Sequence, residues 1–119
     1  MHNQSYTILV INPGSTSTKV AVYQDEEVIF AESHSHTNEE FNGCRRILDQ
    51  LDIRRRVVEN ALIRHGIDVS SLSAVACRGG RLKPVESGTY LVNERMLNDA
   101  RRGLQGEHAS NLGCLIGYE

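Results

Sequence analysis

The sequence predicts an α/β domain with a mixed sheet, in which an antiparallel three-stranded meander is followed by helix–strand units. Near its start the chain has three strand-like segments separated by short clusters of turn-forming residues. A longer segment with apolar residues at helical spacing follows, and after it comes a short apolar strand. A chain of 119 residues has room for one domain with a modest core.

The first strand is expected over Thr7–Asn12, because this continuous apolar run is typical of a strand buried on both faces. The turn formers Pro13–Ser17 separate it from a second strand at Thr18–Tyr23. Asp25–Glu27 predicts a tight turn before a third strand at Val28–Ser33. Connections this short indicate an antiparallel meander.

A helix is expected to follow the meander. Thr37 and Glu40 match a capping box, which predicts that a helix begins there and continues to about His65. Gly66 stands at the position of a C′ glycine. The apolar residues at roughly helical spacing are Cys44, Leu48, Leu51, Val58 and Leu62.

The rest of the chain is expected to contain two short strands and two helices. The two strands are expected at Ser73–Cys77 and Thr89–Val92, with a loop at Arg81–Glu86 between them. Asn93 is expected to cap the first helix, which runs through Arg102 and ends at Gly103. The second helix is expected at Gly106–Glu119. The last helix carries Leu112, Leu115 and Ile116 on one face, which no later element covers. We therefore expect the chain to be the N-terminal part of a longer protein.

Composition disfavours several classes of function. The net charge is −2, whereas a strongly basic nucleic-acid binder needs a positive excess. No apolar run approaches the roughly 18 residues of a membrane span, and no signal peptide is evident. The three cysteines lie far apart without a C-x-x-C motif, which argues against a disulfide framework and a zinc site. We expect a cytoplasmic location, with neither nucleic acid nor membrane as partner.

The stretch from Asn12 to Lys19 is the most informative for function. Its glycine permits a sharp turn and close approach to a ligand, its four successive hydroxyl residues offer donors, and its lysine supplies a positive charge. These are the features that a phosphate chain needs. The stretch differs from a Walker A loop, because Thr18 replaces the second glycine and a strand pattern follows in place of a helix. On its residues alone, a polar hairpin turn without a ligand remains the alternative.

Three motifs resemble the acetate and butyrate kinase family, and particularly its butyrate kinase branch. They are I-L-V-I-N-P-G-S-T-S-T-K-V-A-V-Y at residues 8–23, R-G-G-R-L-K-P-V-E-S-G-T-Y-L-V-N at 78–93 and Q-G-E-H-A-S-N-L-G at 105–113. The motifs keep the family's order and span nearly the whole chain from Thr7, but they correspond to only about the first third of such a kinase. The resemblance implies the ribonuclease H-like fold of actin and Hsp70 ATPases, with two similar domains and a nucleotide cleft between them.

The resemblance also implies roles for individual residues. Asn12 is expected near Mg²⁺ and the transferring phosphate, and Lys19 at the nucleotide phosphates. Arg78 is expected to meet the substrate carboxylate or acyl phosphate, which its planar fork suits bidentately. His108 matches a histidine that lines the same cleft. The other residues implied at the phosphate or substrate are Gly14, Ser15, Thr16, Ser17, Gly79 and Asn111, the last with an altered spacing from the histidine.

By the same resemblance, the reaction is reversible transfer of the ATP γ-phosphate to butyrate, which needs Mg²⁺ and gives butyryl phosphate and ADP. Family members use a downstream aspartate, a second arginine and an adenosine-binding second domain, none of which this chain contains. We therefore expect the chain to be inactive by itself and the full protein to form homo-oligomers. The alternatives are a kinase for isobutyrate, propionate or acetate, a truncated remnant without catalysis, and a relative from the sugar-kinase or Hsp70 side of the superfamily.

The remaining arginines and histidines are expected to have no role in binding or catalysis. Acidic residues are interspersed with Arg54, Arg55 and Arg56, which predicts a solvated helix face. We expect His34 and His36 not to bind a metal, because no carboxylate cluster is evident near them.

Overall fold

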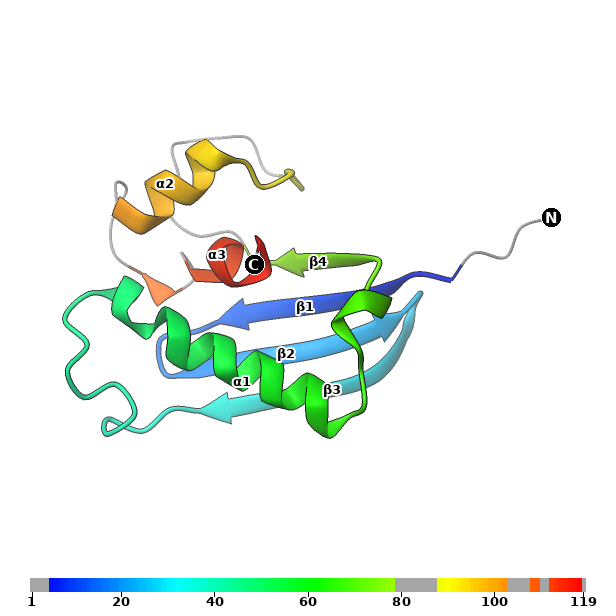
Figure 1. The fold of residues 1–119 in the computed structure, drawn as a ribbon, viewed down its shortest axis with the longest axis horizontal. Helices are drawn as coiled ribbons and strands as arrows, with labels where there is room; N and C mark the ends of the chain where they lie inside the picture. Colours follow the sequence, from blue (N-terminus) through cyan, green and yellow to red (C-terminus); the bar gives the residue numbers. More distant parts are fainter. Residues whose placement is uncertain (1–4, 79–87, 103–107, 110–111, 119) are drawn as a thin grey trace.

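Strand β1 (Thr7–Pro13) lies inside a four-stranded sheet with the order β3-β2-β1-β4 (Figure 1). It pairs antiparallel with β2 (Ser17–Gln24), which pairs antiparallel with β3 (Glu27–Ser35). On its other side β1 pairs in parallel with β4 (Ala74–Cys77). The predicted α/β class, the mixed sheet and the meander are therefore confirmed.

The computed structural model describes residues 5–78, 88–102, 108–109 and 112–118. Within these ranges the helices are η1 (Ile47–Gln50), α1 (Leu51–Arg64), η2 (Val69–Ser71), α2 (Glu94–Arg102) and α3 (Leu112–Tyr118). None of them has the length and apolar character that a membrane span requires. The predicted loop at 81–86 and the closing glycine at 103 lie outside the described residues.

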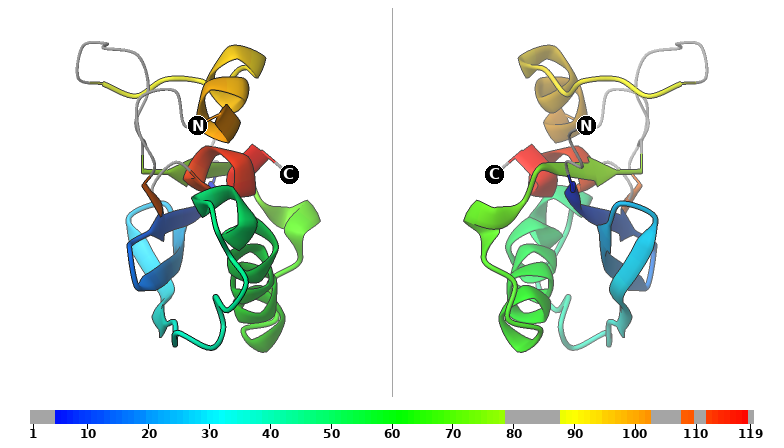
Figure 2. Two further views of the ribbon diagram at one scale, coloured as in Figure 1. Left: turned by 90° about the vertical axis from the view of Figure 1, so that its left-hand side faces the viewer. Right: turned by 90° about the vertical axis from the view of Figure 1, so that its right-hand side faces the viewer.

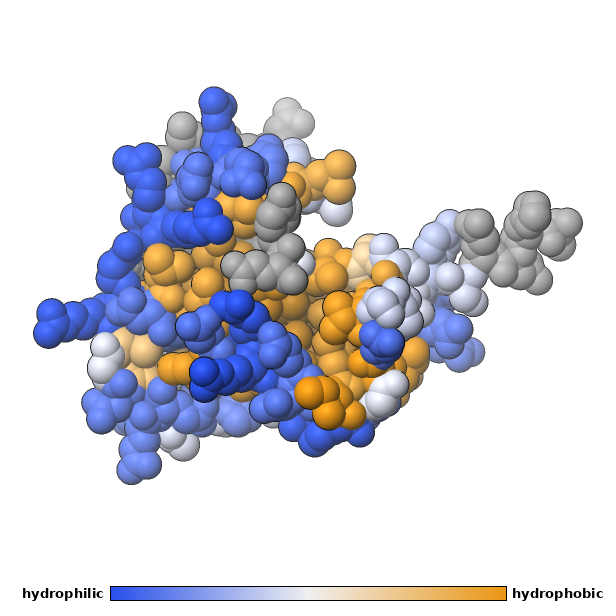
Figure 3. Space-filling model, viewed as in Figure 1, coloured by the Kyte–Doolittle hydropathy of each residue, from blue (hydrophilic) through white to orange (hydrophobic). Residues whose placement is uncertain are grey.

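The core lies between the sheet and its helices. Helices α1 and α3 lie on one face of the sheet (Figure 2), and strand residues alternate so that every second one in β1 and β2 packs toward them. Hydrophilic side chains cover the outward surfaces of α1 and α2, while hydrophobic ones show between the helices (Figure 3). The buried apolar cluster comprises Leu9, Ile11, Val20, Val22, Phe30, Val58, Ala61, Leu62, Leu97, Ala100, Leu112, Leu115 and Ile116.

Helix α3 differs from its prediction in length and in burial. It begins at Leu112, and both His108 and Ala109 lie before it, outside any α-helix. Leu112, Leu115 and Ile116 are 1%, 1% and 5% exposed. The expectation that this face has no cover was wrong, because the sheet and helices α1 and α2 already bury it.

The predicted start of the long helix at Thr37 was also wrong. The two capping hydrogen bonds between Thr37 and Glu40 do form, but they close a turn. Gly43 has a φ of +91°, which a helix does not allow, and Asp49 accepts from the backbone N–H groups of Arg45 and Arg46 to cap the later start. At the other end, Gly66 has the predicted left-handed conformation, with φ +67°.

Residues 89–92 do not form the predicted strand. They lead into α2 as irregular backbone, and Leu91 is 93% exposed. A β-branched and aromatic segment becomes a strand only where a neighbouring strand pairs with it, and none does so in the described part of the chain. Asn93 caps α2 as predicted, since its Oδ1 accepts from the N–H of Met96 at 2.9 Å.

Helix α3 approaches the ends of β1 and β4 so closely that Gly113 has no room for a side chain. A Cβ placed there would lie 2.9 Å from the carbonyl oxygen of Arg78 and 3.2 Å from the Cβ of Cys77. The backbone of one of these elements would have to move to relieve that contact.

We predict that Gly113→Ala lowers the free energy of unfolding by about 1–3 kcal/mol, because the added methyl forces α3 away from the sheet. Urea denaturation measures this change. Gly88→Ala is the matched control, since its Cβ would meet only ordinary contacts at 3.8 Å or more. Equal effects of the two substitutions would contradict the close packing described for α3.

Candidate functional site

The loop between β1 and β2 is a tight hairpin tip. The two strands pair as far as Pro13 and Thr18, and the Gly14 N–H donates to the Ser17 carbonyl oxygen at 2.8 Å. Ser15 and Thr16 are exposed at the tip. The predicted arrangement of strand, hydroxyl-rich loop and strand is therefore confirmed.

Asn12 and Lys19 lie directly opposite each other on the two strands that the hairpin joins. Lys19 is exposed, whereas the Asn12 Oδ1 is buried and has no hydrogen-bond partner among the described residues. Both residues line a shallow hollow of about 400 Å³ on the sheet, together with Val10, Val20, Ala21, Ala31, Glu32 and Ser33. An acceptor without a partner, beside a lysine ammonium, can take part in a polar ligand's shell.

Arg78 lies at the same end of the sheet. Its N–H donates to the Ile11 carbonyl oxygen at 3.2 Å, one residue beyond the last pair of the parallel strands β1 and β4. Parallel strands end at a common edge, so Arg78 neighbours Asn12 in the register. Its side chain is exposed.

The later motif is only partly described. His108 is half-buried and precedes α3, whose Gly113 lies against Arg78, Cys77 and Pro13. Helix α3, which follows His108 in the sequence, therefore begins at the same end of the sheet. The predicted site residues Gly79 and Asn111 lie outside the described residues.

Arg54 is a buried residue of this site that sequence reasoning misplaced. It was expected on a solvated helix face, but its exposed fraction is 0%. Its Nη1 donates to the Ser17 carbonyl oxygen at 2.9 Å and to the Thr18 Oγ1 at 3.3 Å, and its Nη2 donates to the Ser15 carbonyl oxygen at 3.3 Å. Its Nε donates to Gln50. One guanidinium thus holds the hairpin tip from the side of α1.

These contacts fix the direction of the loop's peptide groups. In a trans peptide the C=O and the following N–H point in opposite directions. Because the Ser15 carbonyl points at Arg54, the N–H of Thr16 points away from it, toward the outer side of the tip. The clamp therefore turns a backbone donor outward, where an anion could accept it.

Burial lowers the pKa of Arg54 to about 10, which still leaves the guanidinium protonated at neutral pH. The clamp thus also places a positive charge beneath the tip. The position of Arg54 could have been found from spacing, because it precedes Val58, Ala61 and Leu62 on one helical stripe.

Glu40 is a second residue that the sequence analysis did not connect with its neighbours. Its carboxylate lies 3.1 Å from the Nε2 of His34 and 2.9 Å from the Nδ1 of His36. The sequence analysis saw no carboxylate cluster near these histidines, and it did not anticipate this single carboxylate between them. The capping-box pattern did identify Glu40, but as a helix cap.

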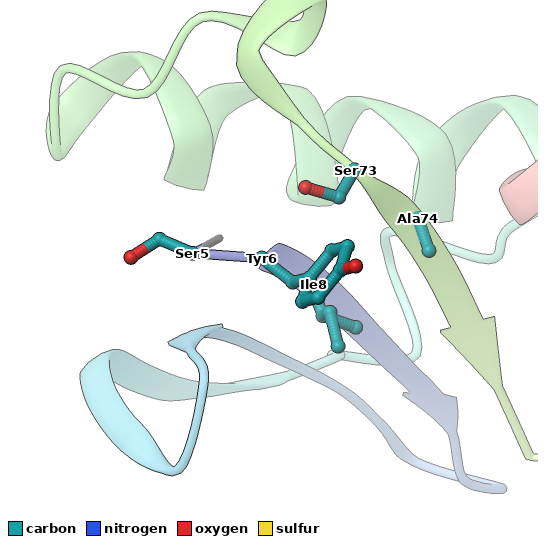
Figure 4. A pocket seen from close by; sticks show the side chains of 5 residues that line it. All are labelled: Ser5, Tyr6, Ile8, Ser73 and Ala74. Atoms are coloured by element: carbon teal, nitrogen blue, oxygen red, sulfur yellow. The ribbon is translucent and has the colours of Figure 1, made fainter. Parts of the chain in front are cut away.

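Another hollow lies at the opposite end of the strands. It is lined by Ser5 and Tyr6 just before β1, by Ile8 within β1, and by Ser73 and Ala74 where β4 begins (Figure 4). The Ser73 Oγ accepts from the Thr7 N–H at 3.0 Å. None of these described lining residues is charged, which distinguishes the hollow from the hairpin end.

The residues at the hairpin end fit a phosphate group that binds with Mg²⁺, as the resemblance implies. The unpartnered Asn12 Oδ1 is the kind of oxygen that Mg²⁺ or one of its water ligands contacts. The Lys19 ammonium and the outward N–H of the tip suit phosphate oxygens. Asn12 and Lys19 would therefore hold the magnesium–phosphate unit from the two strands.

Comparison with known proteins agrees with the motifs. The chain is 52% identical over 112 residues, or 94% of its length, to a probable butyrate kinase of Clostridium botulinum (strain Eklund 17B / Type B). It is also 52% identical over 114 residues, or 96% of its length, to butyrate kinase 1 of Clostridium acetobutylicum. The chain spans about a third of the length of these curated relatives, 32% in each case. No family model matches the chain.

We predict that Arg54→Met lowers the free energy of unfolding by about 2–4 kcal/mol, because it removes the charged donor from three acceptors in the hairpin. Chemical denaturation measures the loss. Arg56→Met is the matched control, since Arg56 is exposed on the same helix and its replacement should change stability by less than about 0.5 kcal/mol. If both variants were as stable as the wild type, the clamp would contribute nothing.

Proposed function

We propose that this homologue of butyrate kinases is the phosphate-binding domain of a short-chain carboxylate kinase that transfers the ATP γ-phosphate to butyrate. Residues 1–119 supply one domain, and a second domain of the protein holds the adenosine. The observation that carries the proposal is the juxtaposition of Asn12, Lys19 and Arg78 at one edge of the sheet, beside a hairpin tip that a buried arginine clamps.

The hairpin end supports the phosphate part of the proposal. Lys19 would neutralise charge on the phosphate chain, while Ser15, Thr16 and Ser17 would donate from backbone or hydroxyl groups. Phosphoryl transfer asks a protein mainly for positioning and charge stabilisation. A clamped tip meets that demand, because its donors need no reorganisation when the phosphate arrives.

Arg78 supports the acceptor part. A carboxylate that attacks ATP brings two anions together, and a guanidinium beside the phosphate site offsets their repulsion. In the reaction, a carboxylate oxygen forms a bond to the γ-phosphorus, and the bond from that phosphorus to the oxygen of the β-phosphate breaks. The products are an acyl phosphate and ADP. When bound, Mg²⁺ supplies charge neutralisation on the phosphate oxygens.

Butyrate is proposed on the names of the relatives, whereas the chemistry of the hairpin end suits any short carboxylate. One methylene in an apolar pocket changes binding by only about 1–3 kcal/mol. Propionate, isobutyrate and acetate are therefore the substrates against which butyrate must be compared.

The direct test is acyl phosphate formation by the longest natural form of the chain, with ATP and Mg²⁺ and each of the four acids. Hydroxylamine trapping measures the product as a hydroxamate. We predict magnesium-dependent product with the highest kcat/KM for butyrate. Absence of acyl phosphate with every acid would overturn the proposed function, and a preference for another acid would overturn the choice of butyrate.

In that protein, Arg78→Ala is predicted to lower kcat/KM for the carboxylate more than about 100-fold, because it removes a bidentate charge-assisted contact. Arg56→Ala, an exposed arginine of α1, is predicted to leave kcat/KM unchanged within about twofold. Near-normal activity of the Arg78→Ala variant would remove this residue from the mechanism.

A further inference from the structure

A compact group of three potential metal ligands lies where β3 ends. Among the described residues, the ligand atoms of His34, His36 and Glu40 all lie within 4.8 Å of one another. One oxygen of Glu40, Oε2, lies 3.1 Å from the His34 Nε2 and 2.9 Å from the His36 Nδ1. His34 and His36 are two residues apart at the extended end of β3, so their side chains lie on the same side of the strand. The turn closed by Thr37 and Glu40 then brings the Glu40 carboxylate between them.

We propose that His34, His36 and Glu40 form a binding site for a first-row divalent transition metal, foremost Zn²⁺, with water completing the coordination. Metal–nitrogen and metal–oxygen bonds to Zn²⁺ are about 2.0–2.1 Å, so the ligands of a tetrahedral site lie roughly 3.3 Å apart. The two distances from the Glu40 Oε2, 3.1 Å and 2.9 Å, are close to this value, and all three ligand atoms lie within 4.8 Å of one another. Two imidazoles and one carboxylate are a donor set that suits Zn²⁺ and related ions, whereas Mg²⁺ prefers oxygen ligands alone.

The surroundings already orient the ligands. The His36 side chain is 0% exposed, its ring packs against Phe41 at 4.6 Å between centroids, and its Nε2 lies 2.7 Å from the Thr18 Oγ1. To bind an ion, the imidazole would carry its proton on Nε2 and donate it to the Thr18 Oγ1, and Nδ1 would give up its hydrogen bond to Glu40 and offer its lone pair to the ion. Such a partner on the other ring nitrogen is the usual way in which a metal-binding histidine is oriented.

The carboxylate is held in the same manner. The Glu40 Oε1 accepts from the Thr37 N–H at 3.2 Å, while Oε2 faces the two imidazoles. The contacts to Thr37 and to the imidazoles therefore position the carboxylate before any ion binds.

The site is separate from the proposed magnesium–phosphate unit, although the two are physically connected. Thr18 contacts both His36 and the guanidinium of Arg54, which holds the carbonyls of Ser15 and Ser17. A metal at this site would tie the end of β3 and its turn to the hairpin. It would stabilise the folded chain in proportion to its occupancy, because the ligands converge only after folding.

The test is calorimetric titration of the metal-free, longest natural form of the chain with Zn²⁺ alone, compared with Glu40→Gln and His34→Gln. Each variant keeps a similar shape but loses one ligand. The two replaced side chains, Glu40 and His34, are partly exposed, at 30% and 44% respectively. Glu39→Gln is the matched control, since Glu39 is an exposed neighbour outside the cluster. His36 is left intact because its buried contact with Thr18 supports the fold.

We expect one Zn²⁺ to bind per chain at this site, with an affinity that falls about tenfold or more in each ligand variant and stays unchanged in Glu39→Gln. Zn²⁺ should raise the melting temperature of the wild type and of Glu39→Gln only. Co²⁺ should give a visible absorption band that the ligand variants lose. Absence of Zn²⁺ binding, or equal binding by the wild type and both ligand variants, would overturn the proposal.

Discussion

The hairpin end depends on the hydrogen bonds made by the guanidinium of Arg54, which is buried between α1 and the β1–β2 hairpin. A buried charge costs folding free energy unless it is hydrogen-bonded, and here the carbonyl oxygens of Ser15 and Ser17 together with the Thr18 hydroxyl provide the acceptors. The contact satisfies polar groups at the tip, joins the longest helix to the hairpin and leaves a positive charge beneath the loop. One side chain thus serves the folding of the hairpin and also the proposed binding of phosphate.

The second constraint is the close contact between α3 and the ends of β1 and β4. Gly113 lets the helix backbone lie against the Arg78 carbonyl, and the Arg78 N–H donates to Ile11, so Arg78 is held next to Asn12. Together the two constraints bring three distant parts of the chain to one edge: the hairpin, the residue after β4 and the start of α3. That edge carries Asn12, Lys19 and Arg78, which belong to the first two motifs that resemble butyrate kinases.

Local patterns were sufficient for much of the fold. The apolar run of β1, the turn formers after it and the alternation in β2 predicted the meander correctly, as Asn93 and Gly66 predicted a helix start and a helix end. The start of α1 was missed because Thr37 and Glu40 make capping hydrogen bonds in a turn that Gly43 then redirects. A capping pattern specifies local hydrogen bonds, but not whether the next residues continue as a helix.

The site was predicted less completely, and for a different reason. The hydroxyl-rich stretch identified Lys19, whereas the roles of Asn12 and Arg78 came from the family resemblance. The register shows that the three residues lie at one end of the sheet. Arg54 was misplaced because its partners lie 36 to 39 residues away in sequence, which charge patterning along the helix cannot show.

The most direct test of the account is a crystal structure of the longest natural form of the chain with Mg²⁺ and a non-hydrolysable ATP analogue. The account predicts the terminal phosphate at the hairpin tip, with Asn12 and Lys19 beside it, and phosphates bound elsewhere would contradict it.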